Sequence, residues 1–319
     1  MLLTYRSLPR FNMPSLAIFL CLWFLVHSPA SYTEEGKVSS DTGELVKIGD
    51  SEIEVVFTDG GLKKLREQAL IWVEKSAQTV AKYYDGFPVS NLVIALIEGE
   101  GDSVSSGIVF GGELPVINVW VGKNATEKSF IKDWVMVHEM AHLAMANVRR
   151  KHHWLEEGLA VYVESISRLQ AGDLTEDYVW RGFMKGMPNG VPKRHETGLD
   201  NTATWGRTYW GGALFCLLVD IDIRRQTDNR HGIRDALRHI AASGHTMVRE
   251  ADILDLMKLG DDALKVDAFK RNYREMALQY THIDLDQLWQ QLGVSMKGDE
   301  IVYNDNAPLA KVRKKLLVN

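Results

Sequence analysis

The sequence predicts an α+β fold, in which a small mixed sheet with two helices is followed by a mainly helical region. Three short apolar runs in the first half, 52–57, 92–97 and 115–121, have the length and composition of strands. From about residue 233 onward, apolar residues recur instead at helical spacing. A chain of 319 residues that is 45% hydrophobic can bury one sizeable core shared by two lobes.

Residues 1–30 have the features of a secretory signal peptide. Two arginines precede an apolar run of eleven residues, 16–26, and Ser28 and Ala30 supply small residues at the −3 and −1 positions of a cleavage site. The run is too short for an ordinary membrane span. We therefore expect a periplasmic or secreted protein with no stable membrane insertion after signal removal. Retention of the segment as an anchor is the alternative.

Net charge and cysteine content further limit the kind of protein this can be. The formal net charge is −5 and no basic tract stands out, so nucleic acid is not an expected partner. Cys21 lies in the signal peptide, which leaves Cys216 alone in the mature chain and excludes an internal disulfide. Cys216 lies in an apolar run, where a small core residue is expected. No feature of the sequence fixes an oligomeric state.

The first lobe begins with the polar segment 34–50, which we expect to be a loop before the first strand. Apolar residues over 62–84 then recur at helical spacing and predict a long amphipathic helix. The segment 99–112 is rich in glycine and serine, and we expect it to be irregular. The strand at 115–121 lies directly before the next helix, expected over 131–148.

The sequence His-Glu-Met-Ala-His at 138–142 lies on that helix. Residues four apart lie one above the other on a helix, so His138 and His142 present both imidazoles to one point. Two neutral imidazoles fit a tetrahedral zinc site, and Glu139 lies where it can accept a proton from a bound water. A catalytic zinc also needs a third protein ligand and an open fourth position. Glu157 is the candidate for this ligand.

The composition of this helix supports a metal site. Ile131 and Val135 are expected on the histidine face and Trp134 on the opposite face, so the helix is apolar on nearly every side and should be buried. Buried histidines and a buried glutamate carry a large desolvation cost unless something pairs with them. A metal ion removes that cost.

The 138–142 motif, followed by Trp-Leu-Glu-Glu-Gly-Leu-Ala-Val-Tyr-Val-Glu at 154–164, resembles the gluzincin metallopeptidases, specifically their aminopeptidase N-like (peptidase MA-like) branch. The resemblance implies Zn²⁺ as cofactor, a peptide or protein substrate, and a thermolysin-like catalytic domain with zinc in the cleft between two lobes. In that branch the glutamate before the glycine is the third zinc ligand, which assigns His138, His142 and Glu157. Fourteen residues separate His142 from Glu157, a shorter connection than in the larger aminopeptidases.

A second site helix is expected over 155–169. Glu164 falls two turns after Glu157 on one stripe, and it is a candidate partner for the free ring N–H of a zinc histidine. A surface carboxylate is the alternative. The histidines at 152 and 153 are expected in a turn, as loop residues rather than ligands.

The segment 208–213 resembles the family's Tyr-x-x-Gly-Ala segment, whose tyrosine stabilises the oxyanion. This resemblance assigns that role to Tyr209. The alternative is that Tyr209 merely begins a core helix.

The family also implies that strand 115–121 is the edge strand that pairs with an extended substrate. The branch's Gly-x-Met-Glu-Asn motif is absent. Glu113 is either a remnant of its amino-terminal anchor or a solvated carboxylate, so exopeptidase action is not implied. The glycine-rich stretch 171–204 is expected to be irregular and to overlie the cleft.

These observations predict a signal peptide at 1–30, an upper lobe with the sheet and the zinc helix at 31–150, and a helical lobe with the third ligand at 151–319. The predicted function is a zinc metallopeptidase with Glu139 as general base. Two alternatives are a zinc hydrolase acting on a non-peptide substrate and a non-enzymatic envelope binding protein on the same scaffold. The intact Glu139 argues against the second of these.

Overall fold

The computed structural model describes residues 43–58 and 61–317. These residues belong to one compact unit, within which the lobe boundary expected at residue 150 stays a prediction. The signal peptide expected over 1–30 lies outside the described residues, and with it the expectations on export and membrane insertion. None of the described helices is both long enough and apolar enough to cross a membrane.

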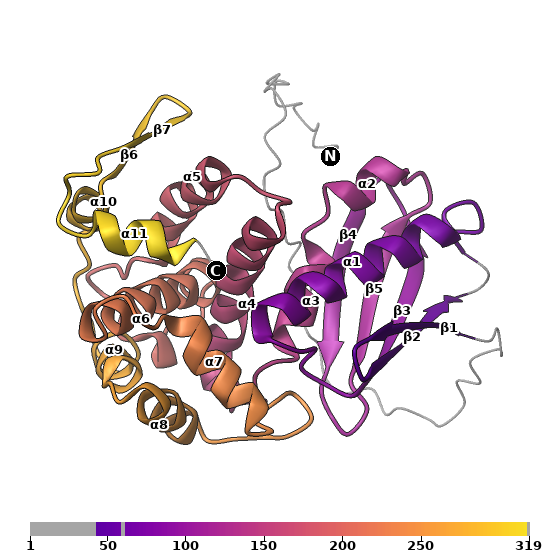
Figure 1. Cartoon of the computed structure of the whole chain (residues 1–319), viewed down its shortest axis with the longest axis horizontal. Coiled ribbons are helices and arrows are strands. Elements are labelled where there is room, and N and C mark those ends of the chain that lie inside the picture. Colours follow the sequence, from indigo (N-terminus) through magenta and orange to yellow (C-terminus); the bar gives the residue numbers. More distant parts are fainter. Residues whose placement is uncertain (1–42, 59–60, 318–319) are drawn as a thin grey trace, which may run out of the picture. The chain divides into compact units, whose positions relative to one another are not determined.

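A mixed five-stranded sheet forms from the first part of the described chain, as the sequence predicted (Figure 1). The strands are β1 Glu44–Ile48, β2 Ser51–Phe57, β3 Asn91–Gly99, β4 Val104–Phe110 and β5 Val116–Gly122. Their order across the sheet is β1-β2-β3-β5-β4. The three central strands run parallel, and each edge strand is antiparallel to its neighbour.

Both edge strands lie where the sequence predicted irregular chain. β1 falls in the polar segment 34–50 and pairs with β2 through the two-residue turn Gly49-Asp50. Gly49 has a φ of +58°, which a glycine adopts at little cost. β4 falls in the glycine- and serine-rich segment 99–112 and pairs with β5. The expectation that 115–121 is the edge strand was therefore wrong, because β5 lies between β3 and β4.

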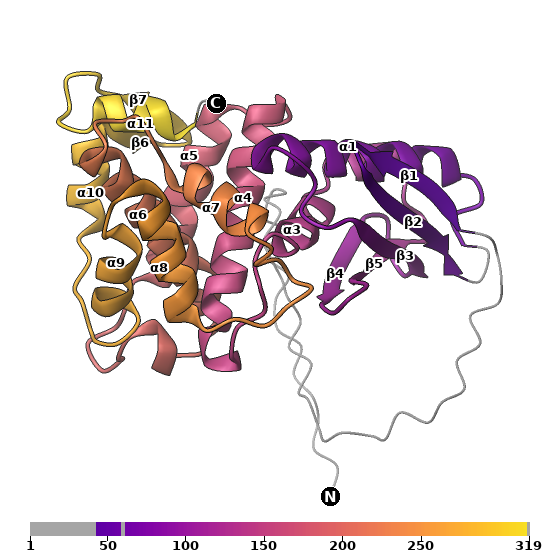
Figure 2. The ribbon, with the colours of Figure 1, turned by 60° about the horizontal axis from the view of Figure 1, so that its bottom comes forward.

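One face of the sheet packs under α1, Arg66–Tyr84 (Figure 2). Side chains alternate between the two faces of a strand, and the residues that point to the covered face are buried. The opposite face of the sheet consists of half-buried and exposed side chains. The buried residues of the central strands include Ile53, Val55, Leu92, Ile94, Ile117 and Val119.

The helix expected over 131–148 is two helices, α2 Glu127–Ile131 and α3 Val135–His142. Asp133 lies between them, and its carboxylate accepts hydrogen bonds from the first two backbone N–H groups of α3, both at 3.0 Å. A side-chain acceptor at this place satisfies donors that a helix start leaves unpaired. The chain therefore begins a new helix just before the two histidines.

The break between α2 and α3 also changes the faces predicted for two residues. Ile131 is 70% exposed and does not share a buried face with the histidines. Trp134 packs edge-on against His138, with ring centroids 5.4 Å apart, instead of lying on the opposite side. The prediction of a buried histidine helix is confirmed, since every residue of α3 is buried.

The remainder of the described chain is helical, as predicted, apart from short turns and one hairpin. The stretch 171–204 is less irregular than expected: it contains a helix that Thr175 caps by accepting the N–H of Tyr178 at 3.3 Å. The elements of this region are α4 His153–Ala171, α5 Glu176–Gly186, α6 Gly212–Gln226, α7 Ile233–Ala242, α8 Ile253–Leu264, α9 Ala268–Met276, α10 Leu285–Leu292, α11 Ala310–Leu316 and the hairpin of β6 Val294–Lys297 with β7 Glu300–Tyr303.

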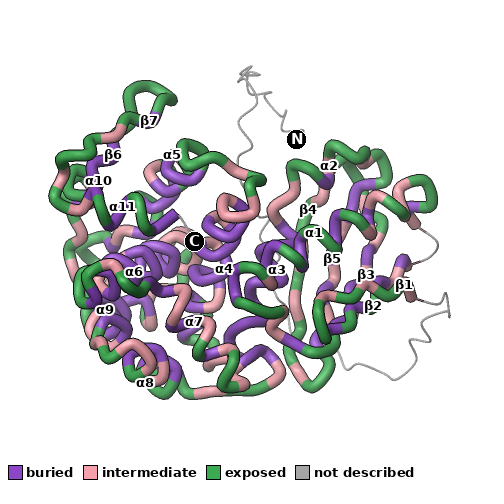
Figure 3. Tube along the Cα trace, viewed as in Figure 1, coloured by how far each residue is buried: buried purple, intermediate pink, exposed green. Residues whose placement is uncertain are grey.

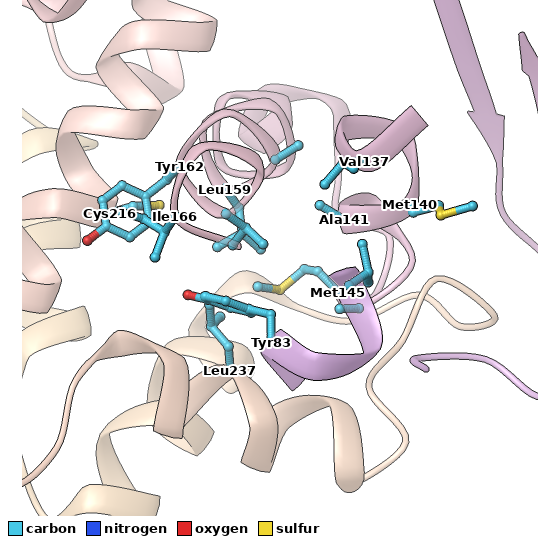
Figure 4. Close-up of a cluster of buried hydrophobic side chains, with 14 of the residues drawn as sticks. Tyr83, Val137, Met140, Ala141, Met145, Leu159, Tyr162, Ile166, Cys216 and Leu237 are labelled. Carbon is cyan, nitrogen blue, oxygen red and sulfur yellow. The ribbon is translucent and has the colours of Figure 1, made fainter. Parts of the chain in front are cut away.

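The helices α3, α4 and α6 are buried along most of their length (Figure 3). Val137 and Ala141 lie on the side of α3 that faces α4, whereas Met140 points toward the sheet (Figure 4). These three side chains and Leu159 of α4 are buried. This packing holds α3 between the sheet and α4, and it places the ends of the two helices side by side.

Candidate metal centre

The two histidines of α3 and Glu157 of α4 meet in one buried place. Nε2 of His138 lies 3.3 Å from Oε2 of Glu157, and Nε2 of His142 lies 3.8 Å from the same oxygen. The candidate ligand atoms of the three residues all lie within 4.8 Å of one another. Each residue is at most 9% exposed. The structure therefore brings together the three residues that the sequence assigned as metal ligands.

This group is a suitable site for a metal ion. Nε2 of His138 and Nε2 of His142 both face Oε2 of Glu157, so the three residues present their ligand atoms to one point. Burial lowers the pKa of His142 to about 4, so this ring is neutral near neutral pH, as a metal ligand must be. Burial raises the pKa of Glu157, but hydrogen bonds from His138 and His153 outweigh it and hold the pKa well below its ordinary value. Two imidazoles and one carboxylate form a donor set that fits zinc.

Glu139 lies beside these ligands and packs against the edge strand β4. A Cβ atom at Gly107 of β4 would come within 2.9 Å of Oε1 of Glu139, so the strand approaches this closely only because residue 107 is glycine. Burial raises the pKa of the Glu139 carboxyl to about 7; the charge of His138 opposes the shift and that of Glu157 adds to it. A carboxylate with a pKa near neutral pH is suited to proton transfer.

His153 is the first residue of α4 and contacts the candidate ligand Glu157. Its Nε2 lies 3.2 Å from Oε1 of Glu157, and its Nδ1 lies 2.9 Å from Oε2 of Glu156. Hydrogen bonds to Glu156 and Glu157 raise the pKa of His153 to about 10. Sequence reasoning treated His153 as a loop residue and missed this contact. The spacing of four residues to Glu157 on one helix was the signal that could have found it.

His152 belongs to a different buried cluster, centred on Asp200. Nδ1 of His152 lies 2.7 Å from Oδ1 of Asp200, and the same oxygen accepts the indole N–H of Trp154 at 2.8 Å. The other oxygen accepts the hydroxyl of Tyr273 at 2.7 Å. Both oxygens of Asp200 are thus occupied, and the cluster fixes the turn at Leu199–Asn201 against α4 and α9.

Glu164 is buried on α4, but its carboxylate does not bond a site histidine. Oε1 accepts from Arg168 at 2.5 Å and Oε2 accepts from Ser165 at 3.1 Å. The alternative of a surface carboxylate is equally wrong, since Glu164 is only 8% exposed. Arg168 lies four residues further on the same helix and competes for this carboxylate. Glu164 neighbours the site as one member of a buried ion pair.

Tyr209 lies in a π-helical turn, Gly206–Gly211, that leads into α6. The turn packs on α4 where two glycines meet: a Cβ atom at Gly158 would collide with the backbone of Gly212. Gly158 directly follows Glu157, so the turn that carries Tyr209 lies next to the helix segment that carries the third ligand. A role for the Tyr209 hydroxyl in the reaction stays a prediction.

Glu113, the other residue for which two interpretations were open, lies beyond the end of β4. It is exposed, in the turn between β4 and β5. Gly107, six positions earlier in the chain, is the residue of the edge strand that contacts Glu139. The structure thus places Glu113 as a solvated turn residue, away from the point where the strand meets the site.

Comparison with protein-family models gives no match, and comparison with curated protein sequences gives none. Among solved structures, an aminopeptidase N family protein from Idiomarina loihiensis aligns with a TM-score of 0.59 and 12% identity over 79% of this chain and 49% of that one. Yeast LTA4 hydrolase aligns with a TM-score of 0.51 and 16% identity over 80% and 44%. The chain therefore has the aminopeptidase N-like gluzincin fold, and it spans about half the length of these proteins.

Proposed function

We propose that this chain is a zinc-dependent metallopeptidase with a thermolysin-like catalytic domain, in which zinc lies between the sheet and the helical region. The observation that carries the proposal is the buried convergence of His138, His142 and Glu157 with Glu139 beside them. These three residues would hold the ion and leave a fourth position open for substrate or water. The likeness to an aminopeptidase N family protein favours the peptide bond as substrate.

The reaction would divide between the ion and the residues around it. When bound, zinc supplies Lewis acidity, which lowers the pKa of a water and polarises the scissile carbonyl. Glu139 accepts the proton of the attacking water on its carboxylate and delivers it to the leaving amine. Tyr209 donates its hydroxyl hydrogen to the substrate oxygen as negative charge develops there.

The edge strand β4 supports a peptide substrate. An extended peptide can add to the edge of a sheet through backbone hydrogen bonds alone. β4 is at the edge of the sheet, and its Gly107 lies against Glu139. A peptide paired with β4 would therefore pass directly over the general base. Because Glu113 lies away from this point, the proposal is for cleavage that does not depend on anchoring a free amino terminus through that residue.

The test is hydrolysis of a mixed peptide library by the full chain, with chelator and after zinc is restored. The wild type should cleave peptides, lose activity with chelator and regain it with zinc. Glu139→Gln keeps the three ligands but removes the proton acceptor, so turnover should fall by roughly 10²-fold or more while zinc stays bound. Glu127→Gln, the same change at an exposed glutamate of α2, is the matched control.

The same assay separates the two alternative functions. Zinc-dependent hydrolysis of esters or other amides without peptide cleavage would replace the peptidase with another zinc hydrolase. Zinc binding with no hydrolysis of any of these substrates would favour a binding protein.

We also propose that the protein is exported, from the signal-like sequence at 1–30. The mature chain should begin near Ser31 and be found in soluble form outside the cytoplasm, which amino-terminal sequencing of the exported protein measures. An intact amino terminus in a membrane fraction would show that the segment is an anchor.

A further inference from the structure

One residue beside the candidate metal centre has no place in the mechanism above. His153 contacts two glutamates, yet it is not one of the three converging ligand residues. We infer that His153 is a positioning residue: its ring holds the carboxylate of Glu157 so that one oxygen faces His138 and His142. The inference rests on the proposed zinc centre and adds a specific contribution to metal affinity.

The argument begins with how Glu157 uses its two oxygens. Oε2 lies 3.3 Å from Nε2 of His138, and Oε1 lies 3.2 Å from Nε2 of His153. A glutamate side chain has several rotatable bonds, and ordering them costs conformational entropy. A hydrogen bond to Oε1 limits that freedom before an ion binds. It also leaves Oε2 as the oxygen presented to the two histidines of α3.

The ring of His153 is itself held in place. Its Nδ1 lies 2.9 Å from Oε2 of Glu156, and Oε1 of Glu156 accepts the backbone N–H of Val148 at 3.1 Å. Val148 belongs to the chain that leaves α3 after His142. The contacts therefore run from the end of α3 through Glu156 and His153 to the ligand on α4. This path spans the fourteen-residue connection between His142 and Glu157.

The exposure of His153 separates this role from a role in folding. Its side chain is 51% exposed, whereas the side chain of His152 in the Asp200 cluster is 4% exposed. Truncating a half-exposed ring opens no buried cavity, and surface substitutions of this kind change stability little. The main effect of losing His153 should therefore fall on the metal centre.

The experiment measures the zinc dissociation constant of the full chain by competition with a chromophoric chelator. Partners that orient a metal ligand typically contribute 10- to 100-fold to metal affinity, so His153→Ala should weaken zinc binding about 10-fold or more. His153→Gln keeps an N–H donor that can reach Glu157, and it should recover part of the loss. The absorption spectrum of the cobalt(II)-substituted protein should shift in His153→Ala, because the ligand carboxylate is no longer fixed.

The matched control is His231→Ala. The His231 side chain is 46% exposed and also pairs with a carboxylate four residues later, Asp235, at 3.7 Å, but it lies just before α7. This variant should bind zinc as the wild type does. Unchanged zinc affinity and an unchanged cobalt spectrum in His153→Ala, with zinc bound normally by the wild type, would overturn the inference alone. A wild type that binds no zinc would overturn both the inference and the proposed function.

Discussion

His152 and His153 are neighbours in the chain, yet they join two buried clusters of opposite character. His152 bonds Asp200, whose two oxygens also accept Trp154 and Tyr273, so the acceptors of that cluster are all used. His153 bonds Glu157, whose other oxygen faces two histidines, and Nδ1 of His138 has no partner among the described residues. A histidine beside a carboxylate thus belongs to a hydrogen-bond network in one cluster and to a group of converging candidate ligands in the other.

The difference shows what distinguishes a functional cluster from a structural one. A buried histidine beside a carboxylate does not by itself indicate a metal site, because the Asp200 cluster has both. The metal centre differs in that Nε2 of two imidazoles and a carboxylate oxygen converge on one another. Such a buried group of acceptors and rings is costly unless an ion pairs with it. The comparison predicts opposite responses of the two clusters to zinc and to mutation.

The largest expected effect is the response to zinc. Zinc at about 1,000 times its dissociation constant should raise the free energy of unfolding of the wild type by about 4 kcal/mol. His142→Ala removes one of the three ligands, so this zinc-dependent increase and the peptidase activity should both disappear. Chemical denaturation with and without zinc measures the effect. His195→Ala, a change at an exposed histidine, should keep the full increase; an equal increase in His142→Ala would remove that residue from the ligand set.

The second-largest expected effect is a loss of stability when the Asp200 cluster is broken. Asp200→Ala leaves three buried donors without an acceptor, and breaking such a buried network should lower the free energy of unfolding by about 3–5 kcal/mol. Zinc affinity should stay within about twofold, because the ligands are not in contact with Asp200. Denaturation and chelator competition on the same preparation measure both quantities. A loss of zinc affinity as large as the loss of stability would show that the two clusters are coupled.

The metal centre should also respond to pH in the metal-free protein. The pKa of Glu139 is raised from 4.5 to about 7 in the folded state, so the folded protein keeps a proton that the unfolded chain releases. Its contribution to stability is complete below pH 4.5 and is lost as the pH rises to about 7. Over this window the wild type should lose about 3 kcal/mol more than Glu139→Gln.

The measurement for this prediction is chemical denaturation of both proteins at a series of pH values with chelator present. Asp133, whose burial raises its pKa to about 6, is present in both proteins, and its charge adds to the rise in the pKa of Glu139. Parallel pH profiles would mean that the pKa of Glu139 is the same in the folded and the unfolded protein.

The smallest expected effect tests whether the Tyr209 hydroxyl acts in the reaction or only in the packing of the helix. If its hydroxyl acts on the developing oxyanion, Tyr209→Phe should lower turnover by about 10²-fold, or about 2.7 kcal/mol, with zinc content, KM and melting temperature unchanged. If the hydroxyl serves only as part of the packed helix, the same change should lower stability by about 1 kcal/mol and leave kcat intact. Steady-state kinetics and thermal denaturation of one variant distinguish the two results.

The central part of the fold was predictable from sequence because its signals are local. β2, β3 and β5 are apolar runs flanked by turn residues, and α1 has a regular helical period. The edge strands β1 and β4 were missed, since they are polar or glycine-rich and are stabilised by pairing with a neighbour. The break between α2 and α3 was missed because the side chain of Asp133 caps a new helix within an apolar stretch.

In the candidate site, too, the features set by local sequence were predictable and those set by tertiary contacts were not. The spacing of His138 and His142 on one helix was enough to place them together. The partners of Glu164 and His153 depend on which of several carboxylates and cations each side chain reaches, and that choice is made by tertiary packing. Glu164 falls on the predicted face of α4 yet pairs with Arg168. His153 was assigned to a turn but begins the helix that carries Glu157.

The contact between Gly158 and Gly212 has a consequence for how this sequence can change over evolutionary time. Backbone meets backbone there, and a Cβ atom at either position would collide with the other segment. The separation between the helix of Glu157 and the turn of Tyr209 is therefore set without any side chain. A single methyl group at either glycine would therefore shift Glu157 and Tyr209 relative to each other.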